Sequence, residues 1–568
     1  MSHEGRLLRA VVLAAVGLGL IAPIAFGLWQ TGRAAFGTLP ALGKDAISLA
    51  PWRELAELPG FGTSLRLTLV TGLGSTVLSL VLATGFCAVV HTRMNTTAGA
   101  RFLAPFLAIP HAAMAVGLAF VLAPSGWIAR LVAPLAGWER PPDFASVNDG
   151  WGLALLIGLM VKEVPFLLLV ILSALSQIPV ARHMAAGRAL GYGRGVVWVK
   201  IIMPQVWPLI RLPVWVVLAY ALSVVDMAII LGPSNPPTLA VAVTRWFSDP
   251  NPAMILPASA GAILQALIVA MAVALLIMAE AAGKRLGRWW LRRGGRGLSS
   301  EPGLWAASTL VMALMLAGVL AMASLVVWSL AWRWSFPQIL PESWSLKPWT
   351  NAQGGWMRAL TNTLLTAGAT VALSLALAIA WLEGEDRARR TRAPWAESLI
   401  YLPLLVPQIG FLYGLNVGFL QIGLSGGIWA VIWAQVLFVF PYVMIALSDP
   451  WRALDARMIR AAAALGAGPT RRLWAVKVPI LIRPILTAAA IGVAVSVAQY
   501  LPTLFMGAGR VATLTTEAVT LTSGSDRRIT GVYASLQAAL PFAAYLAAFL
   551  VPAILHRNRR ALSGKSAT

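Results

Sequence analysis

The chain has 568 residues, of which 59% are hydrophobic and 11% charged, and its mean hydropathy is +0.77. Soluble domains are about 45–50% apolar and about 25% charged, so this composition excludes a soluble globular protein and predicts that most of the chain lies in lipid. The net charge of +23 would suggest nucleic-acid binding in a soluble protein, but the basic residues fall mainly in short loops between apolar runs, which excludes nucleic acid as a partner and indicates membrane topology instead.

The first apolar run, residues 9–29, begins close to Arg6 and Arg9. It resembles a signal peptide in outline, but it is longer than the usual apolar region of about 7–15 residues and lacks a convincing A-x-A cleavage site. We therefore expect an uncleaved first membrane helix.

A helix needs about 20 apolar residues to cross about 30 Å of hydrocarbon, because its backbone polar groups must be satisfied within the segment. The single cysteine, Cys87, lies in an apolar run and cannot form an intramolecular disulfide or a cysteine-based metal site. Six runs in the first part of the chain meet the length requirement: 9–29, 65–90, 102–123, 151–175, 208–232 and 255–281.

Two of these runs contain charged residues, which are costly in lipid and indicate a functional or pairing role. Lys162 and Glu163 are adjacent, just before Pro165, and point about 100° apart on a helix, so we favour pairing with other helices. Asp226 follows Ser223, and residues three apart share one helix face. Pathway lining and helix–helix hydrogen bonding both stay open for Asp226. If Asp226 and Glu163 line a pathway, a cationic cargo is favoured.

A basic loop joins the fourth and fifth runs. It contains RHMAAGRALG at residues 182–191 and, nine residues later, IIMP at 201–204. Small alanines let a short helix lie close to a partner, glycine permits a sharp turn that ends it, and proline starts the next helix. The pattern predicts a helix, a turn and a second helix.

The Arg-, Gly- and Ser-rich segment 284–302 reads as a cytoplasmic linker between a first half, 1–283, and a second half, 303–568. Lys and Arg residues concentrate in alternate loops, which places both termini on the cytoplasmic side. We predict an all-α polytopic membrane protein of about twelve transmembrane helices, built as two parallel six-helix repeats. The second six runs are 304–331, 360–381, 398–420, 427–447, 484–507 and 532–555.

Short motifs recur between the halves. TLVT at 68–71 returns as TLLT at 363–366, and TL at 238–239 returns as TL at 513–514. Gly410, Gly414 and Gly418 lie four apart and predict close helix packing. Ser223 and Asp226 also have matching polar residues in the second half, so the pathway candidates are Lys162, Glu163, Ser223, Asp226, Ser496 and Gln499.

The basic loop recurs as RMIRAAAALG at 457–466, followed after nine residues by VKVP at 476–479. The duplicated pattern resembles the E-A-A-x-x-x-G-x(9)-I-x-L-P loop of binding-protein-dependent ABC importer permeases. The fused layout is similar to thiamine and ferric-iron permeases, most of all to the thiamine type. The residues that match the motif positions are Ala185, Ala186, Gly187, Gly191, Ile201, Pro204, Arg460, Ala461, Ala462, Gly466, Val476 and Pro479.

The resemblance implies a bacterial inner-membrane permease that forms the pathway of an ATP-driven importer. Each loop would dock one of two copies of a separate ABC ATPase, which would bind ATP and Mg, and a periplasmic binding protein would deliver the cargo. That cargo would be thiamine-like or another small cation, with ferric iron or another small solute as the alternative. The two loops are expected to be unequal, because Ala185 and Arg460 stand where the family has an acid and Gly187 stands where it has alanine.

The chain lacks the phosphate-binding pattern G-x-x-x-x-G-K-[ST] and the metalloprotease pattern H-E-x-x-H. We therefore expect no catalytic residue, no cofactor and no metal site in it. A secondary transporter is the alternative from another class, because parallel six-helix repeats also occur there. A structural membrane protein without transport is a further alternative.

Overall fold

The computed structural model describes residues 3–91, 103, 105–294, 300–351, 353–388, 394–524 and 526–555. The first half contains α1 (His3–Val16), η1 (Gly17–Ile21), α2 (Ala22–Ala35), η2 (Pro40–Leu42), α3 (Ala50–Glu57), α4 (Phe61–Val90), α6 (His111–Leu122), α7 (Trp127–Ala136), α8 (Leu153–Leu175), α9 (Val180–Ala189), α10 (Arg194–Val197), η3 (Trp198–Ile202), α11 (Met203–Ser223), α12 (Asp226–Leu231), α13 (Leu239–Phe247), η4 (Pro252–Met254) and α14 (Ile255–Arg292).

The second half contains α15 (Glu301–Leu330), β1 (Ala331–Arg333), β2 (Ser343–Trp344), α16 (Lys347–Asn351), α17 (Gln353–Ala388), α18 (Pro394–Tyr401), η5 (Leu402–Leu404), α19 (Ile409–Gln421), α20 (Ile428–Arg452), α21 (Ala456–Ala464), α22 (Pro469–Arg472), η6 (Leu473–Lys477), α23 (Val478–Ile480), α24 (Ile482–Ala498), α25 (Leu501–Gly507), α26 (Leu514–Leu521) and α27 (Arg527–Leu555).

Ten of the described helices are long and apolar enough to cross a membrane, and up to twelve spans result if each of two bent helix pairs counts as one. The bent pairs are Ser398–Leu404 with Ile409–Gln421, at 97°, and Pro469–Ile480 with Ile482–Ala498, at 77°. The predicted all-α polytopic fold is confirmed. The short antiparallel pair β1–β2, which aligns Ala331 with Trp344, was not predicted.

Two predicted boundaries shift. The helix expected at 102–123 is interrupted at residues 109–110: residues 103 and 105–108 are helical, α6 begins at His111 after Pro110, and residues 102 and 104 lie outside the described residues. α14 continues to Arg292, so part of the expected linker is helical, while residues 295–299 lie outside the described part of the chain. The division into two halves at 284–302 stays a prediction.

The fifth span of each half is broken, where the sequence predicts a continuous helix. α11 ends at Ser223 and α12 begins at Asp226, and the second half has the same kind of break between α24 and α25. Residues three apart share a face only on a continuous helix. The predicted common face of Ser223 and Asp226 is therefore wrong, and so is that of Ser496 and Gln499.

Side chains satisfy backbone carbonyls that the breaks release. Gln265 of α14 donates to the carbonyl of Leu222 at 2.8 Å, and Thr515 of α26 donates to the carbonyl of Val497. Gln537 of α27 donates to Thr515 Oγ1 at 2.7 Å. A membrane helix tolerates an interruption when neighbouring side chains pair its freed polar groups, so these buried residues stabilise the breaks.

The duplicated motifs make the same hydrogen bond in both halves. The N–H of Leu239 donates to Thr68 Oγ1 at 2.8 Å, and the N–H of Leu514 donates to Thr363 Oγ1 at 2.9 Å. Each bond fixes the start of a short helix, α13 or α26, on a long helix, α4 or α17. The sequence repeat therefore corresponds to a repeated tertiary contact.

The first helices of the two halves are exchanged. α1 and α2 pack on α17 and α19, whereas α15 packs on α4 and α6. A Cβ on Gly117 of α6 would lie 2.3 Å from the carbonyl oxygen of Ala321 in α15, and one on Gly414 of α19 would lie 2.2 Å from that of Gly27 in α2. Glycine is required for this approach. The predicted packing role is confirmed at Gly414 and also at Gly418, where a Cβ would lie 2.5 Å from the ring of Phe26.

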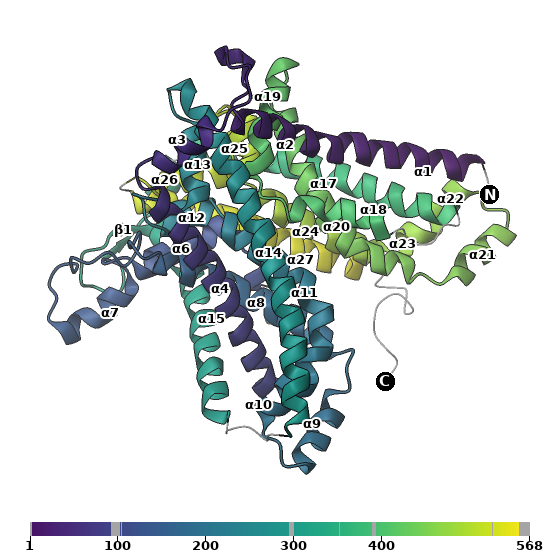
Figure 1. The fold of residues 1–568 in the computed structure, drawn as a ribbon, viewed down its shortest axis with the longest axis horizontal. Coiled ribbons are helices and arrows are strands. Elements are labelled where there is room, and N and C mark those ends of the chain that lie inside the picture. The colour runs from purple at the N-terminus through teal and green to yellow at the C-terminus, as the bar shows by residue number, and fades with distance from the viewer. Residues whose placement is uncertain are drawn as a thin grey trace.

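Figure 1 shows two arms that join at one end of the molecule. One arm carries α4, α8, α11, α14 and α15, with α9 and α10 at its tip, and the other carries α1, α17, α20 and α24, with α21 and α22 at its tip. We call the joined end, where α7 and β1 lie, the far end, and residues 182–204 and 457–479 the first and second repeated loops. The two loops thus lie at separate tips, remote from the far end.

Candidate functional site

The two repeated loops fold alike. A short helix, α9 or α21, ends in a turn at Gly191 or Gly466, whose φ angles are +78° and +80°. Glycine adopts this left-handed conformation without steric cost. A second short helix and a π-helical turn then lead into the next span, with Pro204 or Pro479 in its first turn. The predicted helix, turn and helix are confirmed in both loops.

Each loop leaves apolar side chains uncovered. Leu190 is 64% exposed, and Leu465, at the same place in the second loop, is 87% exposed. Val199 and Trp474 form a second matched pair, 54% and 63% exposed. Exposed apolar patches mark interaction surfaces. The sequence interpretation did not select these four residues. They could have been found, because a large apolar residue at the same position of two basic loops indicates a surface that contacts a partner.

The residues that depart from the family pattern differ in their surroundings. A Cβ on Gly187 would lie 2.4 Å from Val197 Cγ2, so glycine allows α9 to pack closely on α10. Its counterpart Ala462 is half-buried. Ala185 and Arg460, which stand at the family's acidic position, are exposed. The motif alanines that follow them, Ala186 and Ala461, are exposed as well. Ile201 and Val476 are half-buried beneath the loops.

Aromatic and cationic contacts hold the first loop on its arm. The ring of Trp198 lies 5.5 Å from that of His91 at the end of α4. The ammonium of Lys200 lies 4.3 Å from the ring centre of Trp290 in α14. Arg194 contacts Glu301 at the start of α15, with 3.7 Å between Nε and Oε1. The loop is therefore attached to three long helices.

An acidic cradle, which we define as Glu383, Glu385 and Asp386 near the end of α17, holds the second loop. The buried Lys477 donates to Glu383 Oε2 at 2.6 Å and also contacts Asp386. Arg452, at the end of α20, donates to Glu385 at 2.9 Å. The second loop is therefore attached to α17 by ion pairs, and hydrogen bonds between charged groups are stronger than those between neutral groups.

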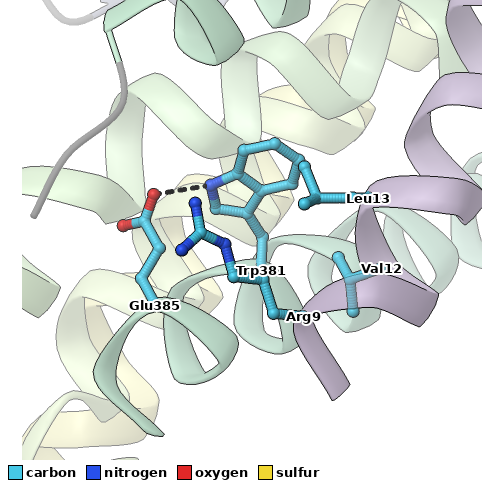
Figure 2. A pocket seen from close by; sticks show the side chains of 5 residues that line it. All are labelled: Arg9, Val12, Leu13, Trp381 and Glu385. Carbon is cyan, nitrogen blue, oxygen red and sulfur yellow. Dashed lines mark hydrogen bonds between the residues drawn. The ribbon is translucent and has the colours of Figure 1, made fainter. Parts of the chain in front are cut away.

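Figure 2 shows how α1 joins the cradle. Arg9, Val12 and Leu13 of α1 lie around Trp381, whose indole N–H donates to Glu385 Oε1 at 3.0 Å. The first helix of the chain therefore contacts the base of the second loop's attachment. The sequence interpretation missed the cradle, because its members are far from the repeated loop in the sequence.

Lys162 and Glu163 pair with different neighbours, as favoured from the sequence. The Lys162 ammonium donates to the carbonyls of Phe106 and Ile109 at 2.9 and 2.7 Å. Glu163 accepts from Ser75 at 3.3 Å and from Ser79 at 3.1 Å, both in α4. Glu163 is therefore directed towards α4.

Asp226 is buried at the break of the first half. The hydroxyl of Tyr220 donates to Asp226 Oδ1 at 3.5 Å, and the Tyr220 ring lies 4.5 Å from the His111 ring. None of the salt bridges within the described part of the chain includes Asp226. An acid in this setting can attract a cation from outside the protein.

The second half has amides at the matching positions. Gln499 lies at the break, and Gln408 Nε2 donates to Gln499 Oε1 at 3.4 Å. Gln408 follows Pro407 just before α19, as His111 follows Pro110 at the start of α6. Sequence reasoning selected Asp226 and Gln499 but missed His111 and Gln408, although the matched prolines that precede them were noticeable.

Two of the pathway candidates make local or intra-half bonds. Ser223 donates to the carbonyl of Ala219 at 2.6 Å, within its own helix. Ser496 donates to Gln435 Oε1 at 2.5 Å, and Gln435 donates onward to Thr503 Oγ1 at 3.1 Å. These serines contribute to packing around the breaks.

Comparison with known proteins agrees with this geometry. The profile of the family described as binding-protein-dependent transport system inner membrane component matches residues 368–558. The inner membrane ABC transporter permease protein YnjC of Escherichia coli (strain K12) is 31% identical over 530 residues, which are 93% of this chain and 96% of YnjC. The chain belongs to the ABC transporter permease family. The permease is thus a multi-pass inner-membrane transport subunit.

Other relatives match shorter segments of the permease. The permease protein PhnV of Salmonella typhimurium (strain LT2), named for 2-aminoethylphosphonate transport, is 26% identical over 185 residues, 32% of this chain and 68% of PhnV. The spermidine/putrescine transport system permease protein PotC of Escherichia coli (strain K12) is 26% identical over 94 residues, 16% of this chain and 36% of PotC. None of these three relatives is named for thiamine or iron.

Proposed function

We propose that the permease forms the pathway of an ATP-driven importer and that each repeated loop seats one copy of a separate ATPase, which binds ATP and Mg. A periplasmic binding protein would deliver cargo at the far end. The observation that carries this proposal is the pair of equally spaced loops, each with an exposed leucine beside a glycine turn at an arm tip. Such apolar tips suit the groove of a partner protein.

This function requires the arm tips to face the cytoplasm. Lys and Arg concentrate in cytoplasmic loops, and both repeated loops are basic. The start of α1 lies against the end of α17, where a Cβ on Gly5 would be 2.7 Å from the carbonyl oxygen of Arg387, so it shares the side of the second loop's attachment. In this orientation both termini are cytoplasmic. The basic residues of the two loops include Arg182, Arg188, Arg194, Arg457, Arg471 and Arg472.

Motion of either loop would reach the pathway through the span that follows it. The first loop continues through η3 and α11 to the break before Asp226, and the second continues through η6, α23 and α24 to the break after Ala498. The contacts of Lys200 and Lys477 tie the loops to the long helices beside these spans. A change in the distance between two ATPase subunits would therefore move the two broken spans.

Leu190→Asp and Leu465→Asp test the docking. Each places a charge in an apolar contact, so we expect both to weaken association with the cognate ATPase and to reduce ATP-driven uptake in proteoliposomes. Leu346→Asp is the matched control. The Leu346 side chain is 66% exposed at the far end, so its replacement should leave association with the ATPase unchanged. Normal ATPase binding by both loop variants, or uptake driven by an ion gradient alone, contradicts the proposal.

We further propose that the cargo is a small cation, such as an amine. Asp226 supports this because it is buried at the break without a salt bridge among the described residues, and Lys162 is directed to backbone carbonyls. The cargoes named for PotC and PhnV, spermidine or putrescine and 2-aminoethylphosphonate, contain amino groups. A small cation of the thiamine type fits the same chemistry.

Asp226→Asn tests the cargo class. It removes the charge while keeping the shape, so we expect uptake of spermidine, putrescine and thiamine to fall by about ten-fold or more for whichever of them is carried. Glu163→Gln is the control: its carboxylate faces Ser75 and Ser79, so cargo preference should stay as in wild type. Unchanged uptake by Asp226→Asn removes the cation assignment and leaves the docking proposal intact.

A further inference from the structure

A cavity of about 460 Å³ opens at the far end of the molecule, where α7, the end of α15 and the start of α27 meet. We call it the far-end pocket. Three arginines line it, Arg130, Arg527 and Arg528, together with Trp328 and Trp334 and a single carboxylate, Asp526. Its walls therefore combine positive charge with aromatic faces, and they come from both halves of the chain.

Arg130 is 2% exposed, and within the described part of the chain its hydrogen bonds go to neutral groups. Its Nε donates to the carbonyl of Ser125 at 2.9 Å, and its Nη1 donates to those of Ser335 and Gln338 at 2.7 and 2.5 Å. The guanidinium carbon lies 4.7 Å from the ring centre of Trp334. Among the described residues no carboxylate forms a salt bridge with Arg130, so its charge is balanced by dipoles alone.

Arg527 is also without an acidic partner in the described part of the chain. Its Nη1 donates to Ser125 Oγ at 2.8 Å, and its guanidinium carbon lies 5.3 Å from the Trp328 ring centre. Asp526 is engaged by Arg528, with contacts of 2.9 and 3.1 Å from Nε and Nη2 to its two oxygens. Among the described residues, two of the three arginines therefore have no carboxylate partner.

Buried charges are normally paired, because removing an ion from water is costly. Guanidinium groups match the geometry of carboxylate and phosphate oxygens, which they bind through two parallel hydrogen bonds. We propose that the far-end pocket binds an oxyanion, a carboxylate or phosphate group, which supplies the missing negative charge to Arg527 and Arg130. Trp328 and Trp334 would cover the apolar part of the molecule that carries this group.

This site is separate from the proposed cation pathway. The proposed cation pathway passes the helix break at Asp226, whose negative charge selects the opposite kind of ligand. α7 belongs to the first half, whereas α15 and α27 belong to the second, so an oxyanion held between Arg130 and Arg527 joins the two halves at the far end. The proposal does not depend on ATPase docking or on the cargo.

The oxyanion can come from solution or from a lipid headgroup, and one binding experiment distinguishes them. The full-length protein in phosphatidylcholine nanodiscs is titrated with inorganic phosphate and with acetate. In parallel, it is incorporated into nanodiscs of phosphatidylglycerol and phosphatidylcholine, and co-isolated lipid is quantified after detergent extraction. We expect either saturable binding of a soluble anion or enrichment of phosphatidylglycerol. Arg527→Gln should lower the anion affinity, or the enrichment of the lipid, about ten-fold.

Arg333→Gln is the matched control. Arg333 lies in β1 at the same end of the molecule, and its side chain is 77% exposed, so this variant should bind the anion as well as the wild-type protein does. Arg527→Lys keeps the charge but loses the paired donors, and we expect intermediate binding. Thermal unfolding confirms that each variant is folded. The proposal is overturned if neither phosphate, acetate nor phosphatidylglycerol binds in preference to phosphatidylcholine, or if folded Arg527→Gln binds as well as Arg333→Gln.

Discussion

At the scale of single residues, Lys477 distinguishes the two repeated loops. It is 5% exposed and is paired with Glu383 and Asp386, whereas the same position in the first loop is occupied by the fully buried, apolar Ile202. The two loops therefore have the same backbone but different attachments: ionic to α17 in the second, and aromatic and cationic, through Trp198 and Lys200, in the first.

Replacing Lys477 with methionine removes the cation that Glu383 and Asp386 share and leaves them with Arg387 and the Trp451 indole, and losing one partner of a buried ion pair costs about 3 kcal/mol. We expect Lys477→Met to lower cargo-stimulated ATP hydrolysis in the reconstituted importer while the basal rate changes less, because the ATPase is intact but poorly coupled. Lys477→Arg should retain coupling. The assay compares hydrolysis with and without loaded binding protein.

Ile202→Met is the matched control at the equivalent position of the first loop, where volume-conserving apolar exchanges are well tolerated. If Lys477→Met and Ile202→Met keep the same stimulated rate, the cradle has no role in coupling. The expected inequality of the loops would then have to rest on Ala185, Arg460 and Gly187.

The residue scale also shows what sequence reasoning can find. The turn glycines Gly191 and Gly466 were recognisable because a left-handed turn after an alanine-rich helix leaves a fixed local pattern. The partners of Lys477 were not, since Glu383 is 94 positions away and only the packing of α17 brings it within 2.6 Å. Local conformation was predictable, whereas partners across helices needed the fold.

At the scale of elements, the broken fifth spans were the main error of the sequence interpretation. Residues 224 and 225 are both valine, which gives no glycine or proline signal for an interruption. The break persists because groups on other helices satisfy the freed carbonyls, Gln265 in the first half and Thr515 in the second. An element boundary set by tertiary hydrogen bonds is not visible in a local sequence window.

Gln265→Leu tests this explanation. The substitution keeps the approximate volume but leaves the carbonyl of Leu222 without its donor, which costs about 1–3 kcal/mol when the group is buried. We expect a lower unfolding temperature in detergent and reduced uptake. Gln421→Leu, at the exposed end of α19, serves as the control and should keep the wild-type unfolding temperature. Equal stability of the two variants contradicts the role assigned to Gln265.

At the scale of the whole molecule, the exchanged first helices change the meaning of the predicted halves. The predicted division at 284–302 follows the sequence repeat, but each arm contains helices from both predicted halves. α1 packs on α17, and α15 packs on α4 and α6. Composition and loop charge were sufficient for the number of spans and the fold class. Which span packs in which arm depends on close contacts such as Gly117 with Ala321, which the sequence alone does not reveal.

If the arms move as units during transport, contacts between helices of one arm persist while contacts between the two arms change. Phe247 of α13, which packs on α4 and α14, and Tyr413 of α19, which packs on α25, stack between the arms, with ring centres 4.2 Å apart and planes at 11°. Gly85 of α4 and Ala307 of α15 lie within one arm, where a Cβ on Gly85 would be 3.1 Å from that of Ala307.

A short thiol crosslinker therefore separates the two kinds of contact. In a Cys87→Ala background, we expect crosslinking of Phe247→Cys with Tyr413→Cys to abolish ATP-driven uptake, because it fixes the two arms to each other, and reductive cleavage to restore it. Crosslinking of Gly85→Cys with Ala307→Cys should leave most uptake intact. Full uptake with the Phe247–Tyr413 crosslink in place would show that this aromatic stack does not open during transport.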